Sequence, residues 1–196
     1  MASRTTPEEL TYDVCQPGDP QISPDGRRIV YTLTQPDRES KKTLTHLWLC
    51  NRDGDNGRQV TFGGLKNDSP RWSPDGSSIA FVSDRVASPA KFGIFVLDVA
   101  QPAEPRQVTA HNQIISELAW SPDGSSIAYT TSFDPENPGE EPAKEDEPAR
   151  VRVTRRLDYK WDGRGFLGDA RNHTWLVDVA TGERRRLTTD LVDHYL

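Results

Sequence analysis

The sequence predicts an all-β fold, a β-propeller with four-stranded antiparallel blades, of which about three are present as an incomplete propeller. The tetrapeptide Ser-Pro-Asp-Gly occurs three times, at residues 23–26, 73–76 and 121–124. Each copy has the same strand-like flanks. The copies recur at the roughly 50-residue spacing of a modular β-structure.

Each tetrapeptide is expected to form a tight turn between the first two strands of a blade. Ser at the first position can hydrogen-bond the backbone, Pro at the second has its φ preset, and Gly at the fourth tolerates left-handed φ. An apolar residue precedes each turn and an alternating strand follows it, which is typical of an antiparallel hairpin. The strands that follow the turns are residues 29–32, 79–82 and 127–130.

A second hairpin is expected in each repeat. Its first strands are residues 47–50, 94–97 and 175–178, and its last strands are residues 58–61, 106–109 and 185–188. Four strands in a repeat of this length are characteristic of a propeller blade. A β-sandwich of repeated hairpins is the alternative, and it is disfavoured because sandwich strands seldom repeat motif by motif at one period.

The pattern divides the chain into an N-terminal lead-in, residues 1–18, and a partial propeller, residues 19–196. The blades are expected at about residues 19–63, 67–110 and 115–189. Within the lead-in, residues 11–14 are expected to pair with a blade edge or to begin a further blade. Propellers close with about four to eight blades, and three blades leave open strand edges. We therefore expect a longer parent protein, with residues 190–196 leading into a next blade, and an isolated chain that oligomerises or aggregates.

Composition excludes several classes of protein. No apolar run approaches the length of a membrane-spanning helix, and the N-terminus lacks the hydrophobic segment of a secretory signal, so a cytoplasmic protein without membrane contact is expected. The net charge of −6 argues against nucleic-acid binding. The two cysteines, Cys15 and Cys50, are expected to be reduced thiols.

Residues 132–171 interrupt the third blade between its second and third strands. Residues 134–148 are acidic and proline-rich, which predicts a solvated loop. The following stretch is basic and alternates with valine, as in a strand with one charged face. The arginines of this stretch are Arg150, Arg152, Arg155 and Arg156. They either pair with the acidic loop on a solvated surface, or line a substrate tunnel or interface and anchor a peptide carboxylate or acidic side chain.

The sequence offers no constellation for catalysis, and we expect no cofactor or metal. It contains no Gly-x-Ser-x-Gly nucleophile elbow and no glycine-rich phosphate loop. Its histidines are not spaced as metal ligands, and His173 is expected to make a structural hydrogen bond. Trp72, Trp120 and Trp175 are interpreted as core residues at equivalent strand positions.

Several stretches carry a resemblance to known families. The run from Ser69 to Arg85 and the segment from Leu176 to Thr188 resemble the blade motif of TolB-type propeller proteins and of the propeller domain of prolyl oligopeptidase-family serine peptidases. Residues 151–166, followed by residues 171–178, resemble the acylaminoacyl-peptidase branch of that peptidase family, and so does the opening of the chain. The resemblance covers nearly the whole chain.

The resemblance implies a propeller followed by a C-terminal α/β-hydrolase domain that carries Ser, Asp and His. The propeller would cover the active site and admit only short or unstructured peptides. Some members release N-acylated amino acids, and others cleave internally. The full-length protein is expected to be a homo-oligomer that acts on short peptides, including N-acylated ones. The chain stops before any hydrolase domain, so no catalytic residue is assigned. The alternatives are a TolB-like or WD40-like interaction propeller with no enzyme attached, and a propeller that binds carbohydrate or a small molecule.

Overall fold

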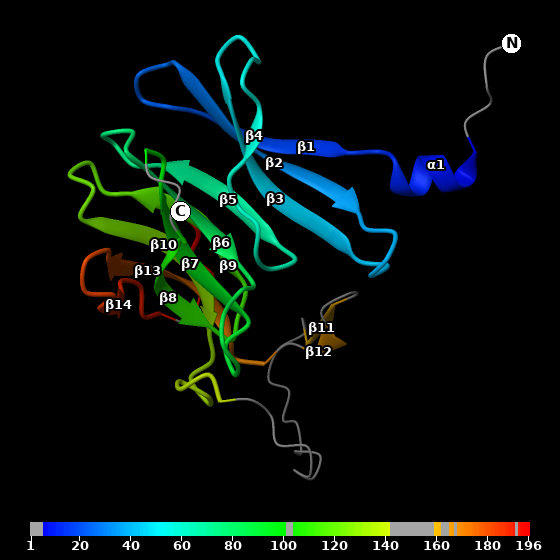
Figure 1. Ribbon diagram of the computed structural model, residues 1–196. Coiled ribbons are helices and arrows are strands. Elements are labelled where there is room, and N and C mark those ends of the chain that lie inside the picture. Colours follow the sequence, from blue (N-terminus) through cyan, green and yellow to red (C-terminus); the bar gives the residue numbers. More distant parts are fainter. Residues whose placement is uncertain (1–5, 101–103, 142–158, 162–164, 167, 191) are drawn as a thin grey trace, which may run out of the picture.

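The computed structural model describes residues 6–100, 104–141, 159–161, 165–166, 168–190 and 192–196. These residues form three four-stranded antiparallel sheets, a two-stranded sheet and one short helix (Figure 1). The predicted all-β fold with three four-stranded blades is therefore confirmed.

Each blade contains four strands in chain order. Blade 1 consists of β1 (Gln16–Ile22), β2 (Arg28–Pro36), β3 (Thr43–Asn51) and β4 (Arg58–Gln59). Blade 2 consists of β5 (Asn67–Trp72), β6 (Ser78–Ser83), β7 (Phe92–Asp98) and β8 (Arg106–His111). Blade 3 consists of β9 (Ile115–Trp120), β10 (Ser126–Phe133), β13 (Arg171–Asp178) and β14 (Arg184–Arg186). The small sheet pairs β11 (Lys160–Trp161) with β12 (Gly165–Phe166), and the helix is α1 (Pro7–Tyr12).

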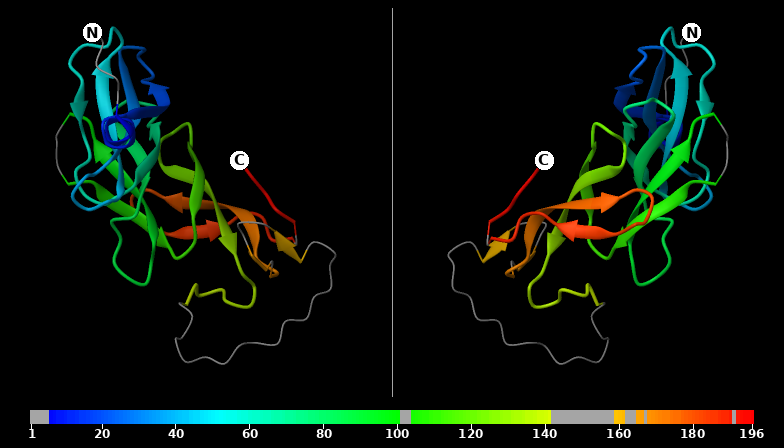
Figure 2. Two further views of the ribbon diagram at one scale, coloured as in Figure 1. Left: turned by 90° about the vertical axis from the view of Figure 1, so that its right-hand side faces the viewer. Right: turned by 90° about the vertical axis from the view of Figure 1, so that its left-hand side faces the viewer.

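The three blades pack side by side, from blue through green to orange in Figure 2. Strand β5 contacts both β1 and β9, so the first strands of the blades form one inner edge. Among the residues that the structure describes, no helix is long and apolar enough to cross a membrane.

The Ser-Pro-Asp-Gly turns have the expected geometry. The fourth residue is a left-handed glycine in every copy, with φ of 70° at Gly26, 70° at Gly76 and 73° at Gly124. In the second copy, the Ser73 hydroxyl accepts the Ser78 N–H at 2.9 Å and donates to Asp75 at 2.6 Å. The three turns lie on one side of the molecule, at the left of Figure 1.

The hydrophobic core lies between the blades. Ile79 and Phe81 of β6 pack in a cluster with Leu47 of blade 1, whereas Ala80 and Val82 of the same strand pack in a cluster with residues of blade 3. Alternate side chains of a strand point to opposite faces, so both faces of blade 2 are buried. Residues 79–83 are therefore all buried, without the alternation of buried and exposed side chains that a strand with one covered face shows.

Two tryptophans connect neighbouring inner strands, and the third does not share their position. Trp72 donates its indole N–H to the carbonyl oxygen of Gln21 at 2.9 Å, and Trp120 donates to that of Arg71 at 3.0 Å. Trp175 lies instead on β13, opposite Tyr129 of β10. The prediction of three equivalent tryptophans is therefore wrong for Trp175.

The lead-in contains a helix. Thr6 caps α1 in a capping box with Glu9, and Pro7 occupies the first turn. The expectation that residues 11–14 pair with a blade edge or begin a blade is wrong, because Thr11 and Tyr12 belong to this helix. Strand β1 begins at Gln16, inside the stretch expected to be lead-in.

Candidate functional site

The basic face of the insertion, interpreted either as a solvated surface or as a substrate-anchoring face, falls outside the described residues. This holds for all four of its arginines, Arg150, Arg152, Arg155 and Arg156. Both interpretations of this face, as a solvated surface and as a substrate-anchoring face, therefore remain predictions.

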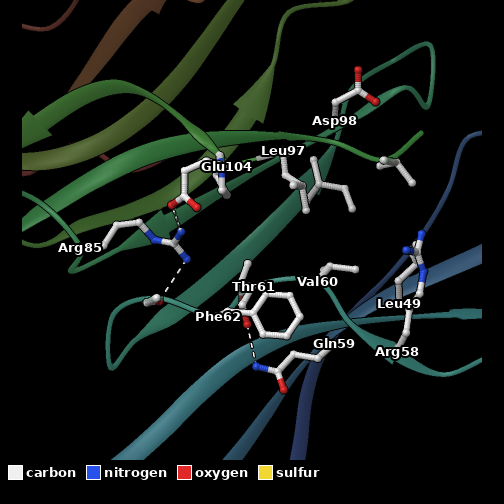
Figure 3. A pocket seen from close by; sticks show the side chains of 14 residues that line it. Leu49, Arg58, Gln59, Val60, Thr61, Phe62, Arg85, Leu97, Asp98 and Glu104 are labelled. Carbon is white, nitrogen blue, oxygen red and sulfur yellow. Dashed lines mark hydrogen bonds and ion pairs between the residues drawn. The ribbon is translucent and has the colours of Figure 1, made fainter. Parts of the chain in front are cut away.

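A pocket of about 220 Å³ lies between blades 1 and 2 (Figure 3). One wall is formed by β4 and the residues that follow it, and the other by the end of β7 and the residues that lead into β8. Its apolar lining comes from Leu49, Val60, Phe62, Ile79, Leu97 and Val99. The described residues that line the pocket include no Ser, Cys, His or Lys. The pocket can therefore hold a small apolar group, and the hydroxyl and carboxylate side chains in its lining are those of Thr61, Asp98 and Glu104.

Arg85 closes one end of this pocket. Its guanidinium donates to the Gly63 carbonyl oxygen at 3.1 Å and pairs with Glu104 at 3.3 Å (Figure 3). It also donates to Asn67 Oδ1 at 2.7 Å. The Arg85 side chain is 10% exposed and that of Glu104 is 87% exposed. Burial lowers the pKa of Arg85, while the negative charges of Glu104 and Asp84 oppose this shift. These contacts give Arg85 a structural role, because it ties the segment between the blades to blade 2.

Charged groups gather along the inner edge of the blades. Asp19, Ser69 and Glu117 occupy the same position in β1, β5 and β9, and each has a positive φ, of 41°, 54° and 55°. Each lies at or beside an irregularity in the strand pairing, as expected of a β-bulge. Asp19 forms an ion pair with Arg71 of the next blade at 2.9 Å. The bulges thus direct polar side chains along the inner edge.

A buried polar network connects the insertion to blades 2 and 3. His111 is 1% exposed, with Nδ1 2.5 Å from Glu140 Oε1 and Nε2 2.8 Å from the Tyr129 hydroxyl. The second Glu140 oxygen accepts the Asn112 N–H at 2.5 Å. Sequence analysis missed this network, because Glu140 lies within an acidic run that resembles a solvated loop.

A second cluster forms where the chain leaves blade 3. His173 makes the structural hydrogen bond expected of it, with Nδ1 2.9 Å from the Thr188 hydroxyl. The rings of His173 and His194 stack with their centroids 5.9 Å apart, and Asp190 contacts His194 Nε2. Sequence spacing gave no sign of this cluster, because His173 lies on β13 and the other two residues follow β14.

Comparisons with known proteins agree with this architecture. The family model described as the TolB beta propeller domain matches residues 14–132. The uncharacterized peptidase YuxL of Bacillus subtilis is 32% identical over 201 residues, which cover 99% of this chain and 29% of that protein.

Two solved structures share the fold. The acylaminoacyl peptidase of Pyrococcus horikoshii superposes with a TM-score of 0.68 at 19% identity, over 92% of this chain and 26% of that one. TolB from Acinetobacter baumannii superposes with a TM-score of 0.56 at 20% identity, over 84% of this chain and 31% of that one. The chain thus spans less than a third of the length of these proteins.

Proposed function

From the premise that the chain belongs to the TolB β-propeller domain family, we propose that it is the propeller portion of a longer serine peptidase. The observation that carries the proposal is the 32% identity to a protein named as a peptidase, which extends over 99% of this chain. The aligned region spans the insertion in blade 3, which lies beyond the 14–132 match to the propeller family. Fold similarity alone would not favour an enzyme, since one fold hosts many functions.

The proposed role of the propeller is steric. A ring of blades beside a C-terminal α/β-hydrolase domain excludes folded proteins and water from the active site and admits short peptides, including N-acylated ones. The core between the blades and the indole–carbonyl bonds of Trp72 and Trp120 supply the rigidity that this role needs. We place the whole protein in the cytoplasm, as a homo-oligomer of the acylaminoacyl-peptidase branch of the prolyl oligopeptidase family.

The test is an activity assay on the full-length gene product. Chromogenic esters or anilides of N-acetylated amino acids should be hydrolysed, and a serine-directed inhibitor should abolish the hydrolysis. Peptides of about ten residues should be cleaved, whereas the same cleavage sequence within a folded protein should not. Absence of serine-dependent hydrolysis across such a panel contradicts the proposal.

The basic face of the insertion is proposed to anchor the substrate. Replacement of Arg155 and Arg156 by Ala should raise KM for peptides with a free carboxylate by about tenfold, which is the loss of a charge-assisted hydrogen bond. The control is Arg185→Ala on β14, an exposed arginine of the same blade. An unchanged KM for every peptide rules out anchoring at Arg155 and Arg156.

A TolB-like interaction propeller without an enzyme is the second candidate. It is favoured by the family match and by the superposition on TolB from Acinetobacter baumannii. The gene downstream of Leu196 distinguishes the two. A Gly-x-Ser-x-Gly motif followed by a later His supports the peptidase, whereas a stop codon after a few more blades supports the interaction propeller.

A further inference from the structure

A partly buried polar contact joins β3 to Thr61 and to the first residue of β5. His46 Nδ1 lies 3.1 Å from Asn67 Nδ2 and 3.5 Å from the Thr61 hydroxyl. The same hydroxyl accepts the backbone N–H of Leu47 at 2.9 Å. Asn67 is fully buried and also donates to two backbone carbonyl oxygens. We interpret this contact as structural, because the hydrogen bonds of the Asn67 amide are all satisfied.

Blade 3 repeats the histidine and the threonine of this arrangement but surrounds them with different side chains. His173 holds the position of His46, and its Nδ1 lies 2.9 Å from the Thr188 hydroxyl, which accepts the Thr174 N–H at 3.1 Å. His194 stands in the position of Asn67, so a second imidazole replaces the amide. The two rings are nearly parallel, with an interplanar angle of 23°.

We propose that His173, Asp190 and His194 bind one divalent transition-metal ion, with Zn²⁺ as the expected occupant. Each residue offers one donor atom, and these three atoms lie within 4.8 Å of one another. Two imidazoles and one carboxylate are a ligand set that Zn²⁺ accepts in proteins, with a water molecule or another group at the fourth position. The Asp190 carboxylate and His194 Nε2 already contact each other, so both donor atoms face the proposed ion position.

The site combines a fixed ligand with two accessible ones. His173 is 3% exposed. The Thr188 hydroxyl hydrogen-bonds His173 Nδ1, and in metal sites the ring nitrogen of a histidine that does not bind the ion is oriented by such a hydrogen bond. The side chains of His194 and Asp190 are 30% and 61% exposed, so an ion reaches them from solvent.

The test uses the chain without a histidine tag, titrated with ZnCl₂ in a calorimeter. One Zn²⁺ should bind per chain, and Co²⁺ in its place should give the intense visible absorption of a tetrahedral site. His194→Asn reproduces the pair found at His46 and Asn67, so it should keep the fold and weaken Zn²⁺ binding at least tenfold. Asp190→Asn should weaken binding as well, and His46→Asn is the matched control that should leave it unchanged.

The outcomes separate a metal site from a second structural contact. Thermal unfolding without metal should be the same for the parent chain and His194→Asn, and Zn²⁺ should raise the Tm of the parent chain only. Equal Zn²⁺ affinity in the parent chain and His194→Asn overturns the proposal. Equal weakening by His46→Asn also overturns it, since the binding is then adventitious.

Discussion

Trp120 donates its indole N–H to the backbone carbonyl oxygen of Arg71, 3.0 Å away, and thereby connects the inner strand of blade 3 to that of blade 2. Trp72 makes the same bond to Gln21 one blade earlier. The repeat therefore includes an inter-blade hydrogen bond as well as a turn. At the corresponding position of blade 1 stands Ile22, which is 67% exposed and contacts no preceding blade among the residues that the structure describes.

Replacement of Trp120 by Phe should destabilise the chain by about 1–3 kcal/mol, because the Arg71 carbonyl loses its donor while the apolar ring is kept. Trp175→Phe is the matched control: the Trp175 Nε1 is buried and has no hydrogen-bond partner among the residues described, so its loss leaves no acceptor unpaired. Urea unfolding followed by circular dichroism measures both variants. Equal destabilisation by the two substitutions would show that the indole–carbonyl bond contributes little.

The carboxylates of the Ser-Pro-Asp-Gly turns should make stability depend on pH in the acid range. The Ser73 hydroxyl and the Ser77 N–H and hydroxyl lower the pKa of Asp75 from 3.8 to about 2, and equivalent bonds lower the pKa of Asp123 to about 2. A carboxylate with a lower pKa in the folded state stabilises the fold above its unfolded pKa and loses this effect as the pH falls. The loss should therefore occur between about pH 4 and pH 2.

The double variant Asp75→Asn, Asp123→Asn isolates this effect. Its free energy of unfolding should change less between pH 4 and pH 2 than that of the parent chain. Guanidinium unfolding at a series of pH values measures the difference. If the two curves of unfolding free energy against pH run parallel, the turns hold their hydrogen bonds equally well when the side chains at positions 75 and 123 are neutral.

The sequence was sufficient to predict the blades because the signals that specify them are local. Ser, Pro, Asp and Gly determine each turn within four residues, and the alternating strands follow at once. The same kind of local signal marked α1, since Thr6, Pro7 and Glu9 form a capping-box pattern, but the β-rich context favoured a strand.

The contacts between blades could not be predicted in the same way. Local sequence places Trp175 with Trp72 and Trp120 because all three end or lie in strands, and only the strand pairing separates their positions. His173 meets His194 only because β13 and the segment after β14 run side by side in blade 3. Such contacts depend on how strands pair in three dimensions, and residue spacing along the chain does not encode them.

Gly93 should be intolerant of a side chain. It occupies the position of His46 and His173 on the third strand of blade 2, but a Cβ there would lie 2.7 Å from Val86 Cγ1 and 2.8 Å from the Thr109 carbonyl oxygen. Because a backbone atom is among these neighbours, Gly93→Ala should cost about 1–3 kcal/mol. Gly57→Ala, where a Cβ meets no atom within 4 Å, should change stability by about 0.5 kcal/mol or less. Thermal unfolding of both variants checks this, and equal Tm values would refute the steric argument.

Glu140 should hold the start of the insertion against blade 2. Burial tends to raise the pKa of Glu140, but the hydrogen bond and charge of His111, the Asn112 N–H and the charge of Arg184 together lower it. Glu140→Ala removes the acceptor of both the His111 ring and the Asn112 N–H, and should destabilise the chain by about 1.5–3 kcal/mol. Hydrogen exchange at the Asn112 amide should become at least tenfold faster.

The neighbouring Glu141→Ala is the control for this substitution, since Glu141 is exposed and bonds to Asn137 through its backbone. The pH dependence gives a second measurement. Because the pKa of Glu140 is lowered in the folded state, its contribution is present above the ordinary value of 4.5 and is lost as the pH falls below it. The gap in stability between the parent chain and Glu140→Ala should therefore narrow from pH 6 towards pH 3. A gap that stays constant over this range would show that Glu140 acts through packing and not through its carboxylate.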